Sequence, residues 1–126
     1  MLEREEIIKI ARERNEQERI IEKDYLLEML LFIIQEITEE LIFKGGTALY
    51  KLYSLNRFSE DLDFTLDGKL NTDKFALKLI RKLEQIGISA RIKELNKYRN
   101  QQNIRLELRG PLFDGNPQSS NVISIN

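Results

Sequence analysis

Apolar residues in the N-terminal part of the chain recur at the spacing of an α-helix. Ile7, Ile8, Ile20 and Ile21 lie among Glu and Arg residues, a pattern typical of helices with a single apolar stripe. The run LLEMLLFII at 26–34 is apolar almost all round, which indicates a helix near the centre of the fold. We therefore expect the N-terminal 40 residues to be helical.

A strand, a turn, a helix and a second strand are predicted to follow. The apolar LIF at 41–43 indicates a short buried strand, which Gly45 and Gly46 interrupt. Thr47 is placed to cap a helix formed by ALYKLY. DLDFTL at 61–66 alternates between polar and apolar residues, which predicts a strand with one buried face.

The C-terminal part of the chain predicts one more helix and three more strands. From Thr72 the apolar residues recur at helical spacing, and Gly87 is placed to end that helix. Strand-like runs at 88–95 and 103–108 flank a polar loop rich in Asn and Gln around 96–102, which predicts a hairpin. The loop GPLFDGNPQSSN then leads to VISIN, where alternation resumes.

Together these elements predict an α+β fold, in which a small mixed sheet carrying the motif strands packs against several helices. A chain of 126 residues is the usual size of one domain, and no repeat or linker divides it. We expect residues 1–40 to form an acidic helical cap and residues 41–126 to form an α/β core that carries the motif.

The absence of cysteine and histidine limits the chemistry. Disulfides, thiolate zinc sites and imidazole bases are excluded, so carboxylates, hydroxyls, amines and backbone amides must do the work. A bound metal would be a hard ion such as magnesium or manganese. No apolar run approaches the ~20 residues of a membrane span, and MLEREEIIKI lacks a signal-peptide layout. We therefore expect a cytoplasmic protein with no membrane partner.

The formal net charge of -1 hides a strong asymmetry along the chain. Residues 1–40 carry 6 basic against 12 acidic side chains, and residues 41–126 carry 14 against 9. The stretch 74–109 holds 10 basic and only three acidic residues. Such a block suits a phosphate backbone or a polyphosphate, and it equally suits an ordinary solvated surface.

The segment GGTALYKLYSLNRFSEDLDF at 45–64 carries the candidate chemistry. Paired glycines let a phosphate approach backbone amides, and the helix after them offers unpaired N–H groups with a favourable dipole. Asp61 and Asp63 share one strand face, about 6 to 7 Å apart along the chain. Two carboxylates on one face suit divalent cations that bridge nucleotide phosphates. Each motif alone is more often structural, but their combination in one strand-helix-strand unit favours nucleotide chemistry.

The pattern FKGGTALYKLY...RFSEDLDF closely resembles the signature of the AbiEii/AbiGii-type toxin family, minimal nucleotidyltransferases of the DNA polymerase beta superfamily. The upstream IEKDYLLEMLL also resembles the N-terminal helix of that family. The similarity is strong across residues 21–64 and weaker from 88 to 126. It implies a nucleotidyltransferase fold and a magnesium-dependent enzyme (manganese is the alternative ion) that moves a nucleoside monophosphate from a nucleoside triphosphate to an acceptor hydroxyl. An RNA such as tRNA is the implied acceptor, and an antitoxin protein is the implied partner.

The resemblance also implies roles for individual residues. Asp61 and Asp63 are the implied catalytic residues and metal ligands. The implied nucleotide-binding residues belong to the glycine turn and to the polar run before the aspartates, namely Gly45, Gly46, Thr47, Arg57 and Ser59.

Superfamily members usually complete the site with a third carboxylate on a neighbouring strand. In this chain the corresponding strand is VISIN, so Asn126 occupies the position or an aspartate would lie beyond it. Glu107 is another candidate if its strand lies beside the strand of the aspartates. Its alternative role is that of an exposed strand glutamate paired with Arg105 or Arg109.

Family members are generally longer than this chain, which leads us to expect truncation at the C-terminus. A second hypothesis therefore stays open beside the enzyme: a catalytically impaired remnant that keeps the fold and binds nucleotide, nucleic acid or a partner protein.

Overall fold

The computed structural model describes residues 2–38, 41–44, 61–66, 71–98 and 101–125. The elements, in chain order, are α1 (Arg4–Arg14), α2 (Glu18–Ile37), β1 (Leu41–Lys44), β2 (Asp61–Leu66), α4 (Thr72–Gln85), β3 (Ser89–Tyr98), β4 (Gln101–Arg109), the 3-10 helix η1 (Pro117–Ser119) and β5 (Asn121–Ile125).

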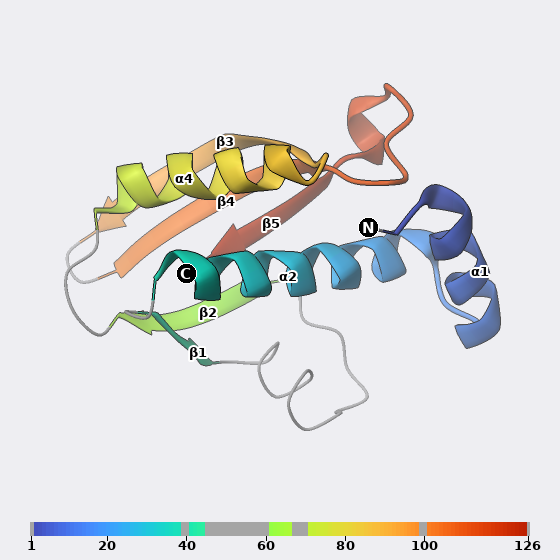
Figure 1. Ribbon diagram of the computed structural model, residues 1–126, viewed down its shortest axis with the longest axis horizontal. Coiled ribbons are helices and arrows are strands. Elements are labelled where there is room, and N and C mark those ends of the chain that lie inside the picture. The colour runs from blue at the N-terminus through green and yellow to red at the C-terminus, as the bar shows by residue number, and fades with distance from the viewer. Residues whose placement is uncertain (1, 39–40, 45–60, 67–70, 99–100, 126) are drawn as a thin grey trace.

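The strands form one mixed sheet of five strands in the order β1-β2-β5-β4-β3. The pairing of β2 with β5 is parallel, and the other neighbouring strands run antiparallel. Helices α2 and α4 lie against the same face of this sheet (Figure 1). The predicted α+β fold, a small mixed sheet packed against helices, is therefore confirmed.

The N-terminal helical segment is divided into two helices at Asn15. This residue has a left-handed backbone (φ 52°, ψ 48°), which asparagine tolerates better than most residues. The chain turns there, and α1 packs on the start of α2 through Ile7, Ala11 and Ile21. The prediction of helix for this region is confirmed, with a break that the apolar pattern did not reveal.

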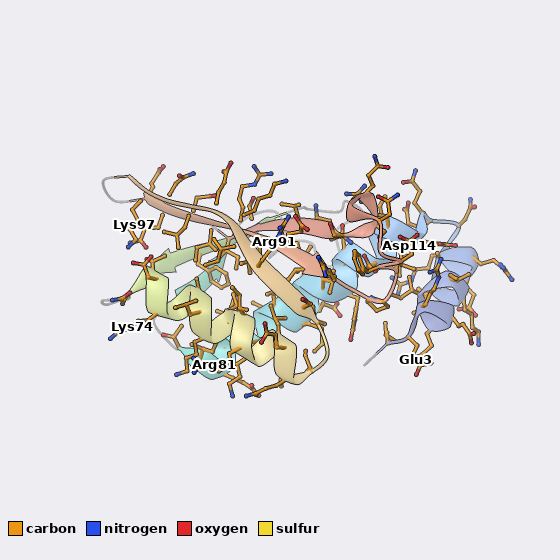
Figure 2. The ribbon with its side chains drawn as sticks, turned by 90° about the horizontal axis from the view of Figure 1, so that it is seen from above. Glu3, Lys74, Arg81, Arg91, Lys97 and Asp114 are labelled. Carbon is orange, nitrogen blue, oxygen red and sulfur yellow. The ribbon has the colours of Figure 1, made fainter. Side chains whose placement is uncertain are left out.

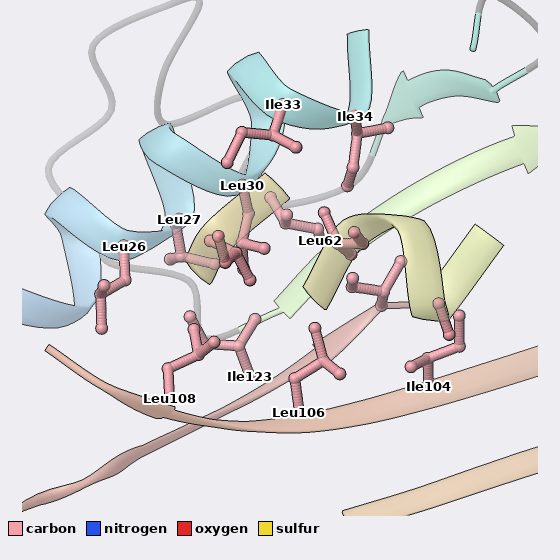
Figure 3. Close-up of a cluster of buried hydrophobic side chains, with 14 of the residues drawn as sticks. Leu26, Leu27, Leu30, Ile33, Ile34, Leu62, Ile104, Leu106, Leu108 and Ile123 are labelled. Carbon is pink, nitrogen blue, oxygen red and sulfur yellow. The ribbon is translucent and has the colours of Figure 1, made fainter. Parts of the chain in front are cut away.

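The main core lies between the helices and the sheet. In Figure 3 the apolar side chains of α2 meet those of β2, β4 and β5. Helix α2 is apolar almost all round, yet only one side of it is buried, and Phe32 on the other side is 59% exposed. The buried residues of the cluster include Leu26, Leu27, Leu30, Ile33 and Ile34 of α2, Leu62 and Phe64 of β2, Phe75, Leu79 and Leu83 of α4, Ile104, Leu106 and Leu108 of β4, and Ile123 and Ile125 of β5.

The hairpin of β3 and β4 is longer than the sequence predicts. Residues 96–98 and 101–102 were expected in a loop, but they continue the two strands. Asn96 pairs with Asn103 in the ladder, and Lys97 binds Asp73 of α4 at 2.9 Å. Polar composition misled the prediction because ladder pairing and the ion pair of Lys97 with Asp73, rather than apolar packing, hold this end of the hairpin.

A buried glutamate ties α2 to the segment that leads into β5. Glu22 is 1% exposed, and its carboxylate accepts hydrogen bonds from Leu112 N at 2.6 Å and Asn121 Nδ2 at 2.5 Å. A Cβ atom at Gly110 would lie 3.0 Å from the same carboxylate, so any larger residue there would have to displace the Glu22 side chain. Glu22 thereby fixes the loop after β4 and the first residue of β5.

The burial difference along α2 predicts a large contrast between two substitutions. Leu30→Ala removes a side chain with 0% exposure and should lower the free energy of unfolding by about 2 to 5 kcal/mol. Phe32→Ala on the exposed side should change it by no more than about 0.5 kcal/mol. Urea unfolding followed by circular dichroism measures both. Equal losses would contradict the assigned orientation of α2.

The environment of Glu22 predicts a pH-dependent contribution to stability. Burial raises the pKa of its carboxyl above the ordinary 4.5, and the hydrogen bonds from Leu112 and Asn121 only partly offset this. Stabilisation by the protonated form is therefore complete below pH 4.5 and is lost as pH rises through the folded-state pKa. The neutral variant Glu22→Gln should gain in stability relative to the wild type as pH rises from 4 to 7.

Urea unfolding at a series of pH values measures this relative gain. Glu13→Gln, on the exposed surface of α1, is the matched control and should show no such trend. A constant difference between wild type and Glu22→Gln over the whole range would contradict the prediction.

Candidate functional site

The face of β2 that carries the aspartates follows from the burial of its other residues. Leu62 is 0% exposed and Phe64 is 8% exposed, and both belong to the core beneath the helices. Because successive strand residues point to opposite faces, positions 61 and 63 belong to the sheet face turned away from α2 and α4. We call this the outer face.

Strand pairing gives each aspartate position its neighbours on the outer face. Asp63 is in register with Lys44 of β1, and Asp61 is in register with Ser124 of β5. Ser124 pairs in turn with Arg105 of β4, and Arg105 pairs with Glu94 of β3. Registered partners share a face, so Asp61, Ser124, Arg105 and Glu94 form a row across the sheet.

Arg105 has unused hydrogen-bonding capacity. Its Nη1 lies 3.7 Å from Glu94 Oε2, which is too long for a hydrogen bond. Its Nε is buried, and no acceptor contacts that atom within the described part of the chain. Arg105 therefore carries a guanidinium that is only loosely neutralised.

Glu107 does not meet the condition set for a third metal ligand. Its strand β4 is separated from β2 by β5, and Glu107 pairs with Val122 rather than with a residue of β2. The expected ion pair with Arg105 or Arg109 is also wrong, because Arg91 Nη2 donates to Glu107 Oε2 at 2.9 Å. This bond is the main cause of the lowered pKa of Glu107. Glu107 is a buried counterion of Arg91, not a neighbour of the aspartates.

The basic stretch 74–109 does not form one continuous surface. Lys74 and Arg81 project from α4 on the helical side of the molecule, whereas Arg91 lies on β3 (Figure 2). Lys97 belongs to the helical side too, since it binds Asp73 of α4. Residues that are close in sequence are therefore divided between two sides of the sheet.

Several predicted site residues lie outside the described residues. These are Gly45, Gly46, Thr47, Arg57, Ser59 and Asn126, together with the predicted helix ALYKLY. Asp61 and Asp63 are described as strand positions only. Among the described side chains, which do not include those of Asp61 and Asp63, no group of three or more acidic residues could hold a metal ion.

Sequence reasoning missed Glu22, although a signal for it was present. Glu22 lies four residues before Leu26 and eight before Leu30, on the stripe of α2 that is buried. An acidic residue on an apolar helical stripe must find hydrogen-bond donors.

No described helix is long and apolar enough to cross a membrane.

Comparison with known proteins places this geometry in a family. The family model described as nucleotidyl transferase AbiEii toxin, type IV toxin-antitoxin system, matches residues 29–118. The fold is similar to that of MenT4, a nucleotidyltransferase toxin from Mycobacterium tuberculosis H37Rv, with a TM-score of 0.65 and 22% identity. That match covers 99% of this chain and 44% of the MenT4 chain, so this chain spans less than half of its length. The search of curated proteins found no match. The chain belongs to the AbiEii family of nucleotidyltransferase toxins of type IV toxin-antitoxin systems.

Proposed function

We propose that this chain transfers a nucleoside monophosphate from a nucleoside triphosphate to an acceptor hydroxyl, with Asp61 and Asp63 as the residues that hold the divalent cation. The acceptor oxygen forms a bond to the α-phosphorus while the bond from phosphorus to the bridging oxygen of pyrophosphate breaks. Pyrophosphate leaves, and the hydroxyl proton passes to solvent.

The pairing of Lys44 with Asp63 is the observation that carries this proposal. Paired Cα atoms in an antiparallel ladder lie about 4.5 to 5.5 Å apart. Gly45 follows Lys44 directly, and consecutive Cα atoms are about 3.8 Å apart. Asp63 therefore lies beside the last residue of β1, from which the sequence continues into Gly45 and Gly46.

The donor chemistry fits magnesium or manganese. The strand register pairs Asp61 with Ser124, so the row that carries this aspartate position also carries a hydroxyl. The chain has no histidine or cysteine, so it offers no imidazole or thiolate ligand for zinc. When bound, the ion would neutralise charge on the triphosphate and on the attacking oxygen.

The remaining nucleotide contacts follow from the family resemblance. Backbone amides of Gly45, Gly46 and Thr47 would bind phosphate oxygens, and the carboxylates hold the ion opposite them. Arg57 would approach the phosphates, and Ser59 would support the site.

The third ligand position belongs to β5 rather than to β4. The register pairs Asp61 with Ser124 and Leu62 with Ile125, so residue 126 is the next candidate along β5. The chain has Asn126 there, a neutral ligand that would hold a cation less tightly than a carboxylate. The second candidate function is a catalytically impaired remnant that keeps nucleotide or nucleic-acid binding, and a neutral residue at the third ligand position is the observation that would favour it.

RNA, with tRNA as the leading example, is the proposed acceptor, and a cognate antitoxin protein is the proposed partner, both in the cytoplasm. These assignments extend the family's description as nucleotidyltransferase toxins of toxin-antitoxin systems.

Replacement of both aspartates tests the proposed site. Asp61→Asn with Asp63→Asn should reduce magnesium-dependent transfer of label from triphosphate to RNA by at least ~100-fold, because even the loss of an outer-shell partner of a metal site costs about 10- to 100-fold. The measurement uses each of the four α-labelled nucleoside triphosphates with unfractionated tRNA. Asp73→Asn, an exposed acid of α4 paired with Lys97, is the matched control and should keep wild-type transfer.

The same proteins separate the two candidate functions. An enzyme shows transfer that the double substitution abolishes. A remnant shows no transfer in the wild type and an RNA affinity that the double substitution hardly changes. Transfer that survives the loss of both carboxylates would refute the proposed site.

A further inference from the structure

The strand order gives the aspartate site two distinct sides. On one side of β2 lies β1, whose last residue Lys44 leads directly into Gly45. On the other side lie β5 and then β4, which carries Arg105 in the same row as Asp61. Lys44 at the end of β1 and Arg105 of β4 therefore lie on opposite sides of the strand that carries the aspartate positions.

This arrangement distinguishes the places of the two substrates. In nucleotidyl transfer the attacking oxygen and the leaving pyrophosphate lie roughly in line on opposite sides of the α-phosphorus. In the proposed function the β- and γ-phosphates bind backbone amides of the glycine segment, which follows β1 in the sequence. The acceptor must then enter from the side of β5 and β4.

Arg105 is the described cation of the outer face best placed to receive that acceptor. Two strand spacings separate its backbone from that of Asp61, about 9 to 10 Å in total. Its side chain is 39% exposed, its Nη1 lies 3.7 Å from Glu94 Oε2, and its buried Nε has no hydrogen-bond acceptor among the described residues. A guanidinium that is partly exposed and only loosely paired can donate charge-assisted hydrogen bonds to a bound anion.

We infer that Arg105 binds a backbone phosphate of the RNA acceptor and thereby holds the acceptor strand across the outer face between β4 and the aspartates. The inference rests on the proposed nucleotidyltransferase function. It divides the basic stretch 74–109 into two parts, since the lysines of α4 lie on the helical side and take no part in acceptor binding.

Arg91, another arginine of this hairpin, is less available. Arg91 donates to the nearly buried Glu107 at 2.9 Å, so a phosphate would have to compete with a well-formed charge-assisted hydrogen bond. Arg105 meets weaker competition from Glu94, whose side chain is 48% exposed. The two pairs therefore predict different responses to substitution.

Binding of fluorescently labelled single-stranded RNA to the whole chain tests the inference. Arg105→Gln should weaken RNA affinity roughly 10-fold, as expected for the loss of a hydrogen bond to a charged group. It should also reduce the slope of log affinity against log salt by about 0.7, the value for one phosphate contact on a single strand. Lys78→Gln on α4 removes the same charge from the helical side and should leave both quantities at the wild-type value.

Two further variants exclude a merely structural role for Arg105. Arg105→Lys keeps the charge and should retain much of the RNA affinity and most of the salt slope. Glu94→Gln removes the competing carboxylate and should tighten RNA binding roughly 2- to 5-fold. If Arg105 served only to hold β3 against β4, Glu94→Gln would not tighten binding.

Triphosphate binding measured in parallel keeps this inference separate from the proposed function. Wild-type affinity for the triphosphate in Arg105→Gln, with weakened RNA binding, supports the inference. Unchanged RNA affinity in Arg105→Gln, or an equal loss in Lys78→Gln, would overturn it while leaving the nucleotide site intact. If the wild-type chain binds no triphosphate at all, the proposed function is wrong, and so is the assignment of nucleotide and acceptor to opposite sides of the aspartates.

Discussion

The alternation of side chains along β2 determines both the core and the candidate site. Leu62 and Phe64 enter the core, which assigns positions 61 and 63 to the outer face. A slip of one residue in the pairing would turn the two aspartates toward the apolar core and expose two large apolar side chains. Burial of two unpaired carboxylates would be strongly unfavourable, so the hydrophobic core itself keeps the aspartates on the outer face.

The second neighbour of β2 reaches its place through a long connection. A parallel pair cannot be joined by a tight turn, and the chain between β2 and β5 forms α4 and the hairpin of β3 and β4 before it returns. Glu22 then fixes the point of return through its bonds to Leu112 and Asn121. A buried carboxylate is weak evidence for stability, but it specifies where β5 begins and thus which residue lies beside Asp61.

The sequence predicts the elements better than it predicts their neighbours. Alternation at 61–66 and helical spacing from Thr72 are local signals. Asn71 marks the start of that helix, because its side chain accepts a hydrogen bond from Lys74 N, and Gly87 marks the end with a positive φ of 85°. The place of β5 between β2 and β4 depends on contacts between residues far apart in the chain, for which no local pattern exists. That is why Glu107 was a reasonable candidate ligand before the strand order was known. The candidate nucleotide site could be proposed from the sequence only because two weak motifs, the glycine pair and the paired aspartates, occur at a specific spacing.

Charge along the sequence is similarly a poor guide to charge on a surface. Residues 74–109 hold 10 basic side chains, but a helix on one side of the sheet and the outer face of a hairpin divide them. Within the hairpin, acidic partners decide which cation is available: Glu107 binds Arg91 closely, whereas Glu94 leaves Arg105 poorly satisfied. A phosphate gains most where the protein has left a donor unused, because there it replaces no existing bond. The strand order and the loosely paired Arg105 together support the proposed direction of the outer face, with the nucleotide on the side of β1 and the acceptor on the side of β4.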